Sequence, residues 1–536
     1  MSVLLSENLQ LISAAPNGIQ KIRALVLDLA IRGKLVPQDP KDEPASVALQ
    51  RFAKARARLE ANGVCKKLKS TPQLRVDECP FEVPSGWEWV RLEVLLSKIG
   101  AGSTPLGGKH AYVEDGIKFL RSQNVWNDGL RLDDVALIPH EVHQKMSGTH
   151  VKSGDLLFNI TGASIGRCAT VPADFDAGNV SQHVTIIRPI SQEILPFLHK
   201  VLISALVQKT VMDVQVGVSR EGLSIGKLSQ FLIPLPPVAE QRRIVAKVDE
   251  LMVLCDSLEV EQSEADSVHA KLVDSLLGTL NQSTDSAALD ANWQRFAKYF
   301  DTIISTSYAV DRLRKAVLSL AAKGQLVPQV GEAERYPLSA VIEGDSLNGC
   351  SKKPENNPSG VQILRISAAT GNDDFLVDEV DHKWIDATPA EIEKFRLLPD
   401  DLLACRFNGN LHYVGSFSLY QGKSAAAQVF PDKLIRFRAR RDKVLPHYLR
   451  YVLNADLART QIESFCATTV GNIGISATNL KTVKVRVPPL DEQHRIIARV
   501  DELMALCATL KADLSESRDR QARLASTLLE SARKVA

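Results

Sequence analysis

The chain contains a few residue patterns that could support catalysis or metal binding, but their spacing fits neither chemistry. The run GLSIGKLS at 222–229 resembles a loop that binds phosphate through backbone amides, yet its two glycines are four residues apart where that loop requires five. No HExxH motif occurs, and the eleven histidines do not group with cysteines at zinc-ligand spacing. The eight cysteines form no CxxC pair. We therefore expect no catalytic residue and no metal site.

Composition indicates a soluble protein of several domains. A chain of 536 residues exceeds what one core normally holds, and 24% charged with 45% hydrophobic residues is ordinary for globular proteins. No apolar run is long enough to span a membrane, and the N-terminus lacks the pattern of a signal peptide. The irregularly spaced cysteines fit reduced thiols. These features predict a cytoplasmic protein without a membrane partner.

The elements that would position any functional residue are encoded by an internal repeat in circular order. Residues 236–259 and 488–511 are identical at 15 of 24 positions, and residues 23–38 match residues 314–329 in a shorter repeat. The order is short repeat, unlike segment, long repeat, and then the same three again. A repeated frame that carries two unlike segments predicts two similar modules with different surfaces.

Each long repeat is predicted to form one helix of about 40 residues, beginning after a Pro-Pro pair because proline is tolerated in the first helical turn. Its apolar residues alternate steps of four and three, a period typical of a coiled-coil seam. The predicted seam positions are Ile244, Val248, Leu251, Cys255, Leu258, Ile496, Val500, Leu503, Cys507 and Leu510. After a break, apolar spacing predicts that the seam resumes at Leu272 and Leu276 and continues in the second copy through Leu514, Leu524 and Leu528.

The repeat order also predicts which helices pair. The C-terminal long helix (about 490–534) should pack on the helix near 17–32, and the central long helix on the helix near 310–322. This arrangement brings the chain ends close together and creates an approximate two-fold axis. Residues 281–309 are interpreted as a connection.

The unlike segments, about 84–235 and 336–487, are predicted to be mixed α/β domains. Both contain short runs of β-branched and apolar residues between glycine-rich turns, and both have a helix-like stretch before the last strand. The predicted strands are 154–160, 183–188, 229–235, 361–366, 434–438 and 481–487, and the helix-like stretches are 194–214 and 446–464. Both segments place Asp-Leu-Leu before such a turn, at 155–157 and 401–403. They are interpreted as one fold with two surfaces.

These features together resemble the specificity (S) subunit of type I restriction–modification systems over essentially the whole chain. The doubled PPxxEQxRI helix start, followed by VDEL, is the most specific mark. Further marks are PSGWEWVRL at 84–92, the Gly-Ser-Thr-Pro turn at 102–105, DLLFNITGASIGR at 155–167 and a family-like N-terminal extension at 42–69. The resemblance implies a mixed α/β (α+β) fold with two target-recognition domains joined by long antiparallel coiled-coil helices in a pseudo-two-fold, circularly permuted arrangement. The implied regions are an N-terminal helical region (1–83), target-recognition domain 1 (84–235), central coiled-coil helices (236–335), target-recognition domain 2 (336–487) and a C-terminal coiled-coil helix (488–536).

The resemblance further implies a division of labour. Each target-recognition domain would recognise one half of a bipartite, asymmetric site in double-stranded DNA, and the helices would set the gap between the halves. Two methyltransferase (M) subunits would supply S-adenosylmethionine chemistry, and restriction (R) subunits would supply the ATP- and Mg-dependent step, so this chain would bind no cofactor and would not be an enzyme. Consistent with this, the sequence lacks the [DNS]PP[YFW] motif of amino-methyltransferases.

Candidate DNA-binding residues follow from the chemistry of base recognition. Arginine and lysine suit guanine, and asparagine and glutamine suit adenine. In the first domain the candidates of these types in loops are Arg121, Gln123, Asn124, Lys145, Arg167, Asn179, Gln182 and Arg220, joined by Thr104 in the turn at 102–105. In the second they are Arg365, Arg406, Asn408, Asn410, Lys423 and Gln428, joined by Arg436 and Arg438 on one strand. For each one, an ordinary surface role is the competing interpretation.

Net charge does not reveal DNA binding. Residues 86–237 contain 14 basic and 14 acidic residues, and residues 336–487 contain 19 and 17, whereas dedicated DNA-binding domains are usually basic. Two alternatives therefore stay open. One is a coiled-coil adaptor that recognises no DNA, and the other is a stand-alone DNA-modifying enzyme with an unrecognised site.

Overall fold

The computed structural model describes residues 7–68, 74–107, 111–216, 222–283, 285–331, 333–355, 358–469 and 472–535. The chain divides into two units, the first comprising residues 1–263 and 518–536 and the second comprising residues 264–517. Two long helices, α9 (Val238–Gln282) and α18 (Leu490–Val535), each begin in one unit and end in the other. The predicted 40-residue helices are thus slightly longer, at 45 and 46 residues.

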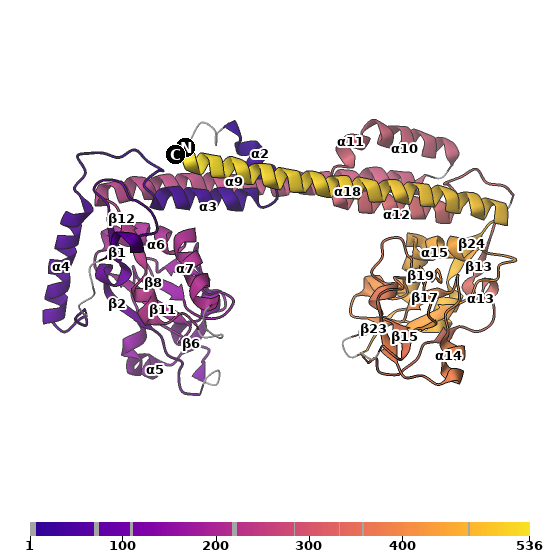
Figure 1. Cartoon of the computed structure of the whole chain (residues 1–536), viewed down its shortest axis with the longest axis horizontal. Helices are drawn as coiled ribbons and strands as arrows, with labels where there is room; N and C mark the ends of the chain where they lie inside the picture. Colours follow the sequence, from indigo (N-terminus) through magenta and orange to yellow (C-terminus); the bar gives the residue numbers. More distant parts are fainter. Residues whose placement is uncertain are drawn as a thin grey trace. The chain divides into compact units, whose positions relative to one another are not determined.

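Unit 1 contains a globular domain built on two four-stranded sheets (Figure 1). One is antiparallel, in the order β2 (Leu96–Ala101), β11 (Val184–Pro189), β8 (Leu156–Asn159) and β9 (Cys168–Thr170). The other is mixed, in the order β6 (Ala136–Ile138), β3 (Ile117–Leu120), β10 (Gly178–Val180) and β7 (His150–Val151), with β3 and β10 parallel. Strands β1 (Glu88–Arg91) and β12 (Leu232–Leu235) pair where the chain enters and leaves the domain.

Unit 2 contains corresponding sheets, with four strands in the antiparallel sheet and three in the mixed sheet. The antiparallel sheet runs β14 (Leu347–Asn348), β21 (Leu434–Phe437), β17 (Leu402–Cys405) and β19 (Phe417–Leu419), and the mixed sheet runs β16 (His382–Ile385), β15 (Val361–Leu364) and β20 (Gln428–Val429). The strands that open and close the domain are β13 (Glu334–Pro337) and β24 (Lys484–Val487), and a third sheet joins β18 (Phe407–Asn408), β23 (Asn472–Gly474) and β22 (Ala467–Thr469). The predicted fold class, mixed α/β with two like domains and long helices, is confirmed.

The helices of both domains lie where the apolar pattern predicted them, with one difference. Each helix-like stretch is broken in two, into α6 (Leu195–Leu202) and α7 (Ala205–Val216) in unit 1 and into α15 (Pro446–Asn454) and α16 (Asp456–Ser464) in unit 2. The remaining helices are α2 (Leu9–Ala14), α3 (Gly18–Ile31), α4 (Ala45–Ala61), α5 (His140–Lys145), α8 (Ile225–Ser229), α10 (Ser286–Lys298), α11 (Phe300–Ile303), α12 (Ser307–Lys323), α13 (Leu338–Val341), α14 (Pro389–Phe395) and α17 (Ala477–Thr482). Residues 281–309, predicted as a connection, join α9 to α12 and contain two helices of their own, since α10 buries Phe296 and α11 buries Ile303.

Contacts within unit 1 show how the short repeat packs between the two long helices. Arg23 of α3 forms ion pairs with Asp256 and Glu259 of α9, while Asp42, after α3, pairs with Arg243 near the start of α9, so α3 and α9 run antiparallel. Lys21 donates a hydrogen bond to Ser526 of α18. The C-terminal helix therefore packs on the helix near the N-terminus, as the repeat order predicted (Figure 1).

Unit 2 repeats this arrangement with the long helices exchanged. Asp311 of α12 pairs with Lys511 of α18, and the Val330 amide donates to Glu492, so α12 is antiparallel to the beginning of α18. Asp274 of α9 pairs with Arg312 of α12, in the parallel sense. Each short helix is thus antiparallel to the start of one long helix and packs on the end of the other.

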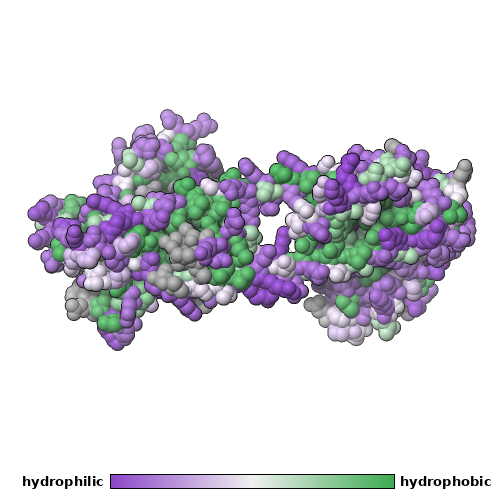
Figure 2. Space-filling model, turned by 90° about the horizontal axis from the view of Figure 1, so that it is seen from above, coloured by the Kyte–Doolittle hydropathy of each residue, from purple (hydrophilic) through white to green (hydrophobic). Residues whose placement is uncertain are grey.

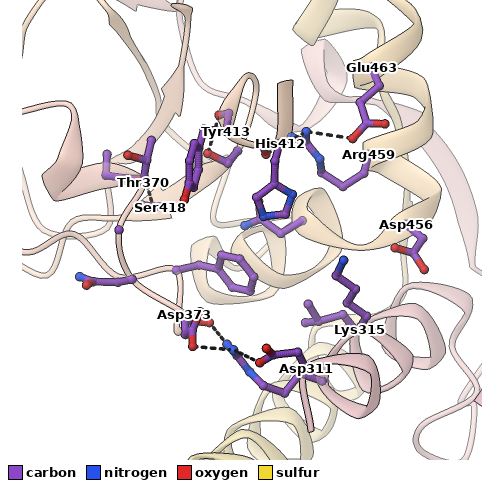
Figure 3. Close-up of a pocket in the computed structure, with 18 residues that line it drawn as sticks. Asp311, Lys315, Thr370, Asp373, His412, Tyr413, Ser418, Asp456, Arg459 and Glu463 are labelled. Carbon is purple, nitrogen blue, oxygen red and sulfur yellow. Dashed lines mark hydrogen bonds and ion pairs between the residues drawn. The ribbon is translucent and has the colours of Figure 1, made fainter. Parts of the chain in front are cut away.

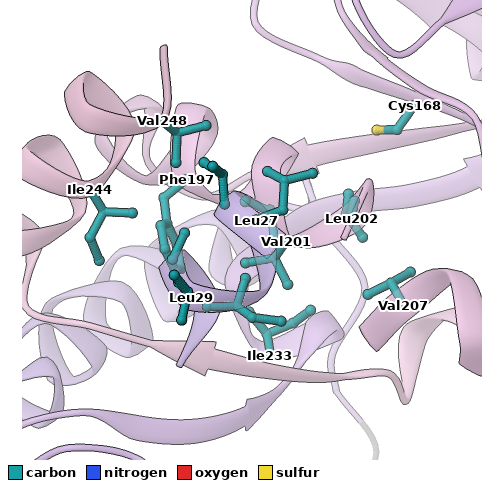
Figure 4. Close-up of a cluster of buried hydrophobic side chains, with 14 of the residues drawn as sticks. Leu27, Leu29, Cys168, Phe197, Val201, Leu202, Val207, Ile233, Ile244 and Val248 are labelled. Atoms are coloured by element: carbon teal, nitrogen blue, oxygen red, sulfur yellow. The ribbon is translucent and has the colours of Figure 1, made fainter. Parts of the chain in front are cut away.

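The first part of each predicted seam is buried. Ile244, Val248, Leu251 and Cys255 belong to the core of unit 1, as Figure 4 shows for Ile244 and Val248 beside Phe197, and Leu258 packs against its edge. In unit 2, Ile496, Val500 and Cys507 are buried, and Leu503 and Leu510 pack against the core.

The second part of each seam differs from the prediction by one position. Leu272 and Leu524 are exposed, and the buried residues are Val273, Leu277 and Leu280 in α9 and Ala525, Leu529 and Ala532 in α18; Leu276, Leu514 and Leu528 are partly buried. Residues 259–268 and 515–521, in the middle of the two helices, are exposed. Because the far end of each helix packs on a different short helix, its buried face is set by that partner rather than by continuation of the 3.5-residue period.

The Glu-Gln pair of the long repeat is a buried polar joint in both units. Glu240 accepts hydrogen bonds from the Trp87 indole (2.9 Å) and from Gln38 (2.7 Å), and the Gln241 side chain donates to the Pro236 carbonyl. Burial raises the pKa of Glu240, and the two hydrogen bonds oppose that shift. The joint fixes the start of α9 to the first strand region of the domain, since buried polar groups must be satisfied.

In unit 2 the equivalent Glu492 is buried against Arg486 at 2.8 Å. The Gln493 side chain donates to the Pro488 and Lys443 carbonyls and accepts from the Leu445 amide. The repeated glutamine makes the same bond to the first proline in both units, whereas the repeated glutamate has different side-chain partners.

Candidate nucleic-acid interface

Four loops of the first domain meet at one edge of its two sheets. The Asn159 side chain, at the end of β8, donates to the Ser122 carbonyl at 2.8 Å, and Thr161 lies 2.6 Å from the His183 ring. The amide of Ser103 donates to the Val180 carbonyl. These bonds join the loops at 102–105, 121–131, 160–167 and 181–183, which carry Thr104, Gln123, Arg167 and Gln182.

Arg167 is the candidate with the most defined environment. Its guanidinium carbon lies 3.7 Å from the ring centroid of Trp126, and Trp126 is 39% exposed at the tip of the hairpin formed by β4 (Val125–Trp126) and β5 (Gly129–Leu130). The guanidinium has no hydrogen bond or ion pair with another described residue. Its five donors therefore remain available to a ligand.

Thr104, Gln123, Lys145 and Gln182 are exposed, and a nucleic acid could reach them. Gln182 has one long contact, 3.5 Å to the His183 ring. Arg121 is partly buried, and its guanidinium donates to the Asp134 carbonyl. Lys145 ends α5, which lies outside the four joined loops. Arg220 lies outside the described residues.

Two predicted amides of the first domain serve the fold instead. Asn124 is buried, accepts from the Arg121 amide and donates to the Arg131 carbonyl. Asn179 is fully buried, and its amide donates to Met146 and Thr149 while its oxygen lies 2.5 Å from His143. For either side chain to reach a base, these bonds would have to break and buried groups would be left unsatisfied. Both residues therefore stabilise the fold.

In the second domain Gln428 is structural for the same reason. It lies on β20, which pairs in parallel with β15 as β10 pairs with β3 around Asn179. Its side chain is buried and donates to Gln362 and to the Glu379 carbonyl. Each domain thus buries an amide side chain on the strand that pairs in parallel within its mixed sheet, at positions one residue apart in register. The sequence alone does not distinguish such an amide from one on the surface.

Arg406, Asn408 and Asn410 lie together on the segment that follows β17. The Arg406 guanidinium lies 4.7 Å from the Phe407 ring, and it has no hydrogen bond or ion pair with another described residue. Asn408 and Asn410 each accept a hydrogen bond from the backbone amide two residues later, which stabilises the turn. Asn410 is exposed, whereas Asn408 is partly buried.

The remaining candidates of the second domain are dispersed. Arg365 is exposed and pairs with Asp381 at 3.4 Å, and Lys423 is exposed on a separate loop. Arg436 is partly buried and donates to the Arg396 carbonyl, and burial lowers the pKa of its guanidinium. The structure does not gather these three residues with Arg406.

Arg438, another predicted DNA-binding residue, pairs with a buried carboxylate. Its guanidinium contacts Asp401 at 2.7 and 3.2 Å, and Arg188 holds Asp155 in the same way at 2.6 and 2.8 Å in the first domain. The aspartates are those of the two Asp-Leu-Leu sequences, and both are buried. Comparison of the two Asp-Leu-Leu sequences could have predicted this pairing, because each domain has a basic residue opposite the aspartate.

We expect Arg438→Ala to destabilise unit 2 by about 3 kcal/mol, since it leaves the Asp401 carboxylate buried without its counter-ion while Arg438 itself is partly exposed. Arg441→Ala is the matched control, because Arg441 pairs with Asp400 and its side chain is 65% exposed. Such a surface pair contributes less than about 1 kcal/mol. Urea unfolding of the two variants measures the difference, and equal midpoints would contradict a structural role for Arg438.

A cavity of about 380 Å³ in unit 2 is lined by charged residues of α12, the 369–375 loop and α16 (Figure 3). These groups largely neutralise one another: Asp373 pairs with Arg314 at 3.0 Å, and Arg459 pairs with Glu463 and donates to the Val414 carbonyl. Burial lowers the pKa of His412, which nearby Lys315 and Arg459 reinforce. The cavity contains no nucleophile paired with a base among the described residues.

The described part of the chain contains no group of three or more His, Cys, Asp or Glu residues able to hold a metal ion. It also contains no single helix long and apolar enough to cross a membrane; by length and composition alone, only the bent pair 192–202 and 205–213 could. Residues of that pair, such as Phe197 and Val201, lie in the core of unit 1. Figure 2 shows hydrophilic and hydrophobic residues interspersed over each unit in that view.

The sequence comparisons with known proteins all identify the same protein family. A family model described as "Type I restriction modification DNA specificity domain" matches residues 84–265 and 350–517, which together exceed half of the chain. The Type I restriction enzyme EcoEI specificity subunit of Escherichia coli is 28% identical over 96% of this chain and 94% of its own length. The EcoAI specificity subunit of the same species is also 28% identical, with the same coverage.

The fold is likewise similar to a solved structure. A chain from a solved structure described as "Structural basis underlying complex assembly and conformational transition of the type I R-M system" superposes on this chain with a TM-score of 0.52 and 20% sequence identity. The similarity covers 85% of this chain and 99% of that chain. It supports the arrangement of secondary structure described above.

Proposed function

Since the chain belongs to the type I restriction–modification DNA specificity family, we propose that it is the subunit that recognises the DNA site for a type I complex. Each target-recognition domain binds one half of a bipartite site in double-stranded DNA. The main support for this proposal is that the family model matches both halves of the chain. The two domains also have corresponding sheets and differ in their loop residues.

The helical frame has a separate role in this proposal. Helices α9 and α18 pass from one unit to the other, so they set the number of base pairs between the half-sites. Two M subunits, which bind S-adenosylmethionine, dock on the frame, and R subunits with ATP and Mg join the complete cytoplasmic complex. The chain itself is the recognition subunit and performs no catalytic step.

The strands that open and close each domain support the boundaries that we propose for the recognition domains. We assign domain 1 to residues 84–235, between the start of the chain segment that forms β1 and the end of β12. Domain 2 spans residues 336–487, which include the second half of β13 and all of β24. The flanking regions 1–83, 236–335 and 488–536 contribute the frame.

The available candidates for DNA contact are those that the fold leaves accessible. In the first domain they are Thr104, Gln123, Lys145, Arg167 and Gln182, and in the second they are Arg365, Arg406, Asn410 and Lys423. The near-neutral charge of both domains means that phosphate contacts must come from local groups or from the M subunits.

Long-read methylation mapping tests the proposal. DNA from cells that express this chain with its cognate M subunit is compared with DNA from cells that express the M subunit alone. A new adenine-methylated motif with two short specific halves around a fixed gap is the expected result. Absence of any new motif, despite a stable complex with the M subunit, would favour an adaptor that recognises no DNA.

A further inference from the structure

Among the described residues, each recognition domain presents one arginine that lies over an aromatic ring and has no bonded acceptor. From this we propose that Arg167 and Arg406 recognise a guanine in the first and second half-sites, and that Trp126 and Phe407 position them. The inference rests on the proposed function and assigns specific residues and a base to it.

The backbone before Arg167 and the hairpin that carries Trp126 are both constrained. Gly166, directly before it, adopts φ +87°, and a Cβ atom there would lie 2.3 Å from Gln208. On the other side the Trp126 indole donates to the Gln123 carbonyl at 2.9 Å, and Asn127 accepts from the Cys168 amide at 3.0 Å. The hairpin that carries Trp126 is therefore bound to the strand that begins one residue after Arg167.

Arg406 is fixed by a different backbone arrangement. Its amide donates to the Lys433 carbonyl at 2.7 Å, and its carbonyl accepts from the Ile475 amide at 3.0 Å. Phe407 follows on β18, opposite Gly474 of β23, where a Cβ atom would lie 2.4 Å from the ring. Glycine at that position gives the Phe407 ring the space to lie beside the Arg406 guanidinium.

Stacking suits guanine recognition because it orients the guanidinium plane without using its N–H donors. A planar fork of donors matches the O6 and N7 acceptors of guanine, and an aromatic face attracts the cation. The guanidinium groups of other candidate arginines are already bonded within the protein. Arg121 bonds the Asp134 carbonyl, Arg365 pairs with Asp381, and Arg438 pairs with Asp401. Arg167 and Arg406 share both properties, the stacked ring and the free donors.

The test measures discrimination one base pair at a time with the chain in complex with its M subunit. Arg167→Ala should lose about 5- to 150-fold of discrimination at one G·C pair of the first half-site, the factor expected for a bidentate contact, and leave the second half unchanged. Arg406→Ala should do the reverse. Arg131→Ala and Arg441→Ala are matched controls, since their guanidinium groups pair with Asp128 and Asp400.

The positioning role of Trp126 has its own variants. Trp126→Ala should weaken discrimination at the same base pair as Arg167→Ala, and Trp126→Phe, which retains an aromatic face, should restore most of it. The melting temperature of each complex is measured in parallel. A purely structural tryptophan would instead lower the melting temperature and affect all base pairs of that half-site alike.

Failure of the inference and failure of the proposed function give different results. If the unaltered chain directs a bipartite motif and both arginine variants retain its full discrimination, the guanine-contact assignment is overturned and the specificity role stands. If the unaltered chain directs no bipartite motif, the specificity role itself is overturned.

Discussion

Replacing residues 84–235 with the equivalent segment of another specificity subunit is expected to change one half of the methylated sequence and leave the other half and the gap unchanged. Strands β1 and β12 pair at the two ends of this segment, from Glu88 with Leu235 to Arg91 with Leu232, so the junctions lie side by side. A domain inserted through adjacent junctions can be exchanged without displacing the frame. Each base pair that the new domain does not match should cost about 1–3 kcal/mol of binding.

The reciprocal exchange of residues 336–487 is the control, because β13 and β24 pair at its ends in the same way. It should change only the other half of the site. The donor segment must retain a tryptophan equivalent to Trp87, since the indole bonds the buried Glu240. Methylation mapping of both chimaeras supplies the readout, and a change in both halves from either exchange would refute modular recognition.

Leu251→Asp is expected to destabilise unit 1 by at least about 3 kcal/mol, because it removes a buried leucine and places a carboxylate among apolar side chains. Leu251 is 4% exposed and belongs to the same core as Ile22 of α3 and Ala525 of α18. The substitution therefore disturbs the core that α3, α9 and α18 share in unit 1. Chemical unfolding measures the stability, and co-purification with the M subunit measures assembly.

Val253→Asp is the matched control, since Val253 lies two residues further along the same helix and is 63% exposed. It introduces the same residue, with the same helix propensity, and should change stability by no more than about 0.5 kcal/mol. If the frame sets the gap between the half-sites, Leu251→Asp should also abolish methylation at fixed spacing. Full assembly and an unchanged gap in that variant would argue against this role of the frame.

The duplicated frame could be predicted from the sequence because its signals are local. Pro-Pro pairs mark the starts of α9 and α18, and the four-three spacing of apolar residues identifies the buried face near those starts. The order of the repeats then determined which helices pair. Positions such as Ile244 and Ile496 are buried because a periodic apolar stripe can be buried on one face only.

The far ends of the same helices were decided by tertiary structure. Val273 and Ala525 are buried where the period had indicated Leu272 and Leu524, since the neighbouring helix there is a different one. The phase of a heptad pattern cannot be continued through a helical segment that is exposed on all sides, because that segment has no buried face.

Which polar residues face a ligand was also decided by the tertiary structure. Asn124, Asn179 and Gln428 have the right chemistry for adenine, and Arg438 has the right chemistry for guanine, but their donors and acceptors are bonded inside the fold. A side chain that can hydrogen-bond a base can equally well hydrogen-bond the backbone, so residue type determines what a site could recognise. Only the positions of its neighbours determine whether the donors of Arg167 or Arg406 are free to do so.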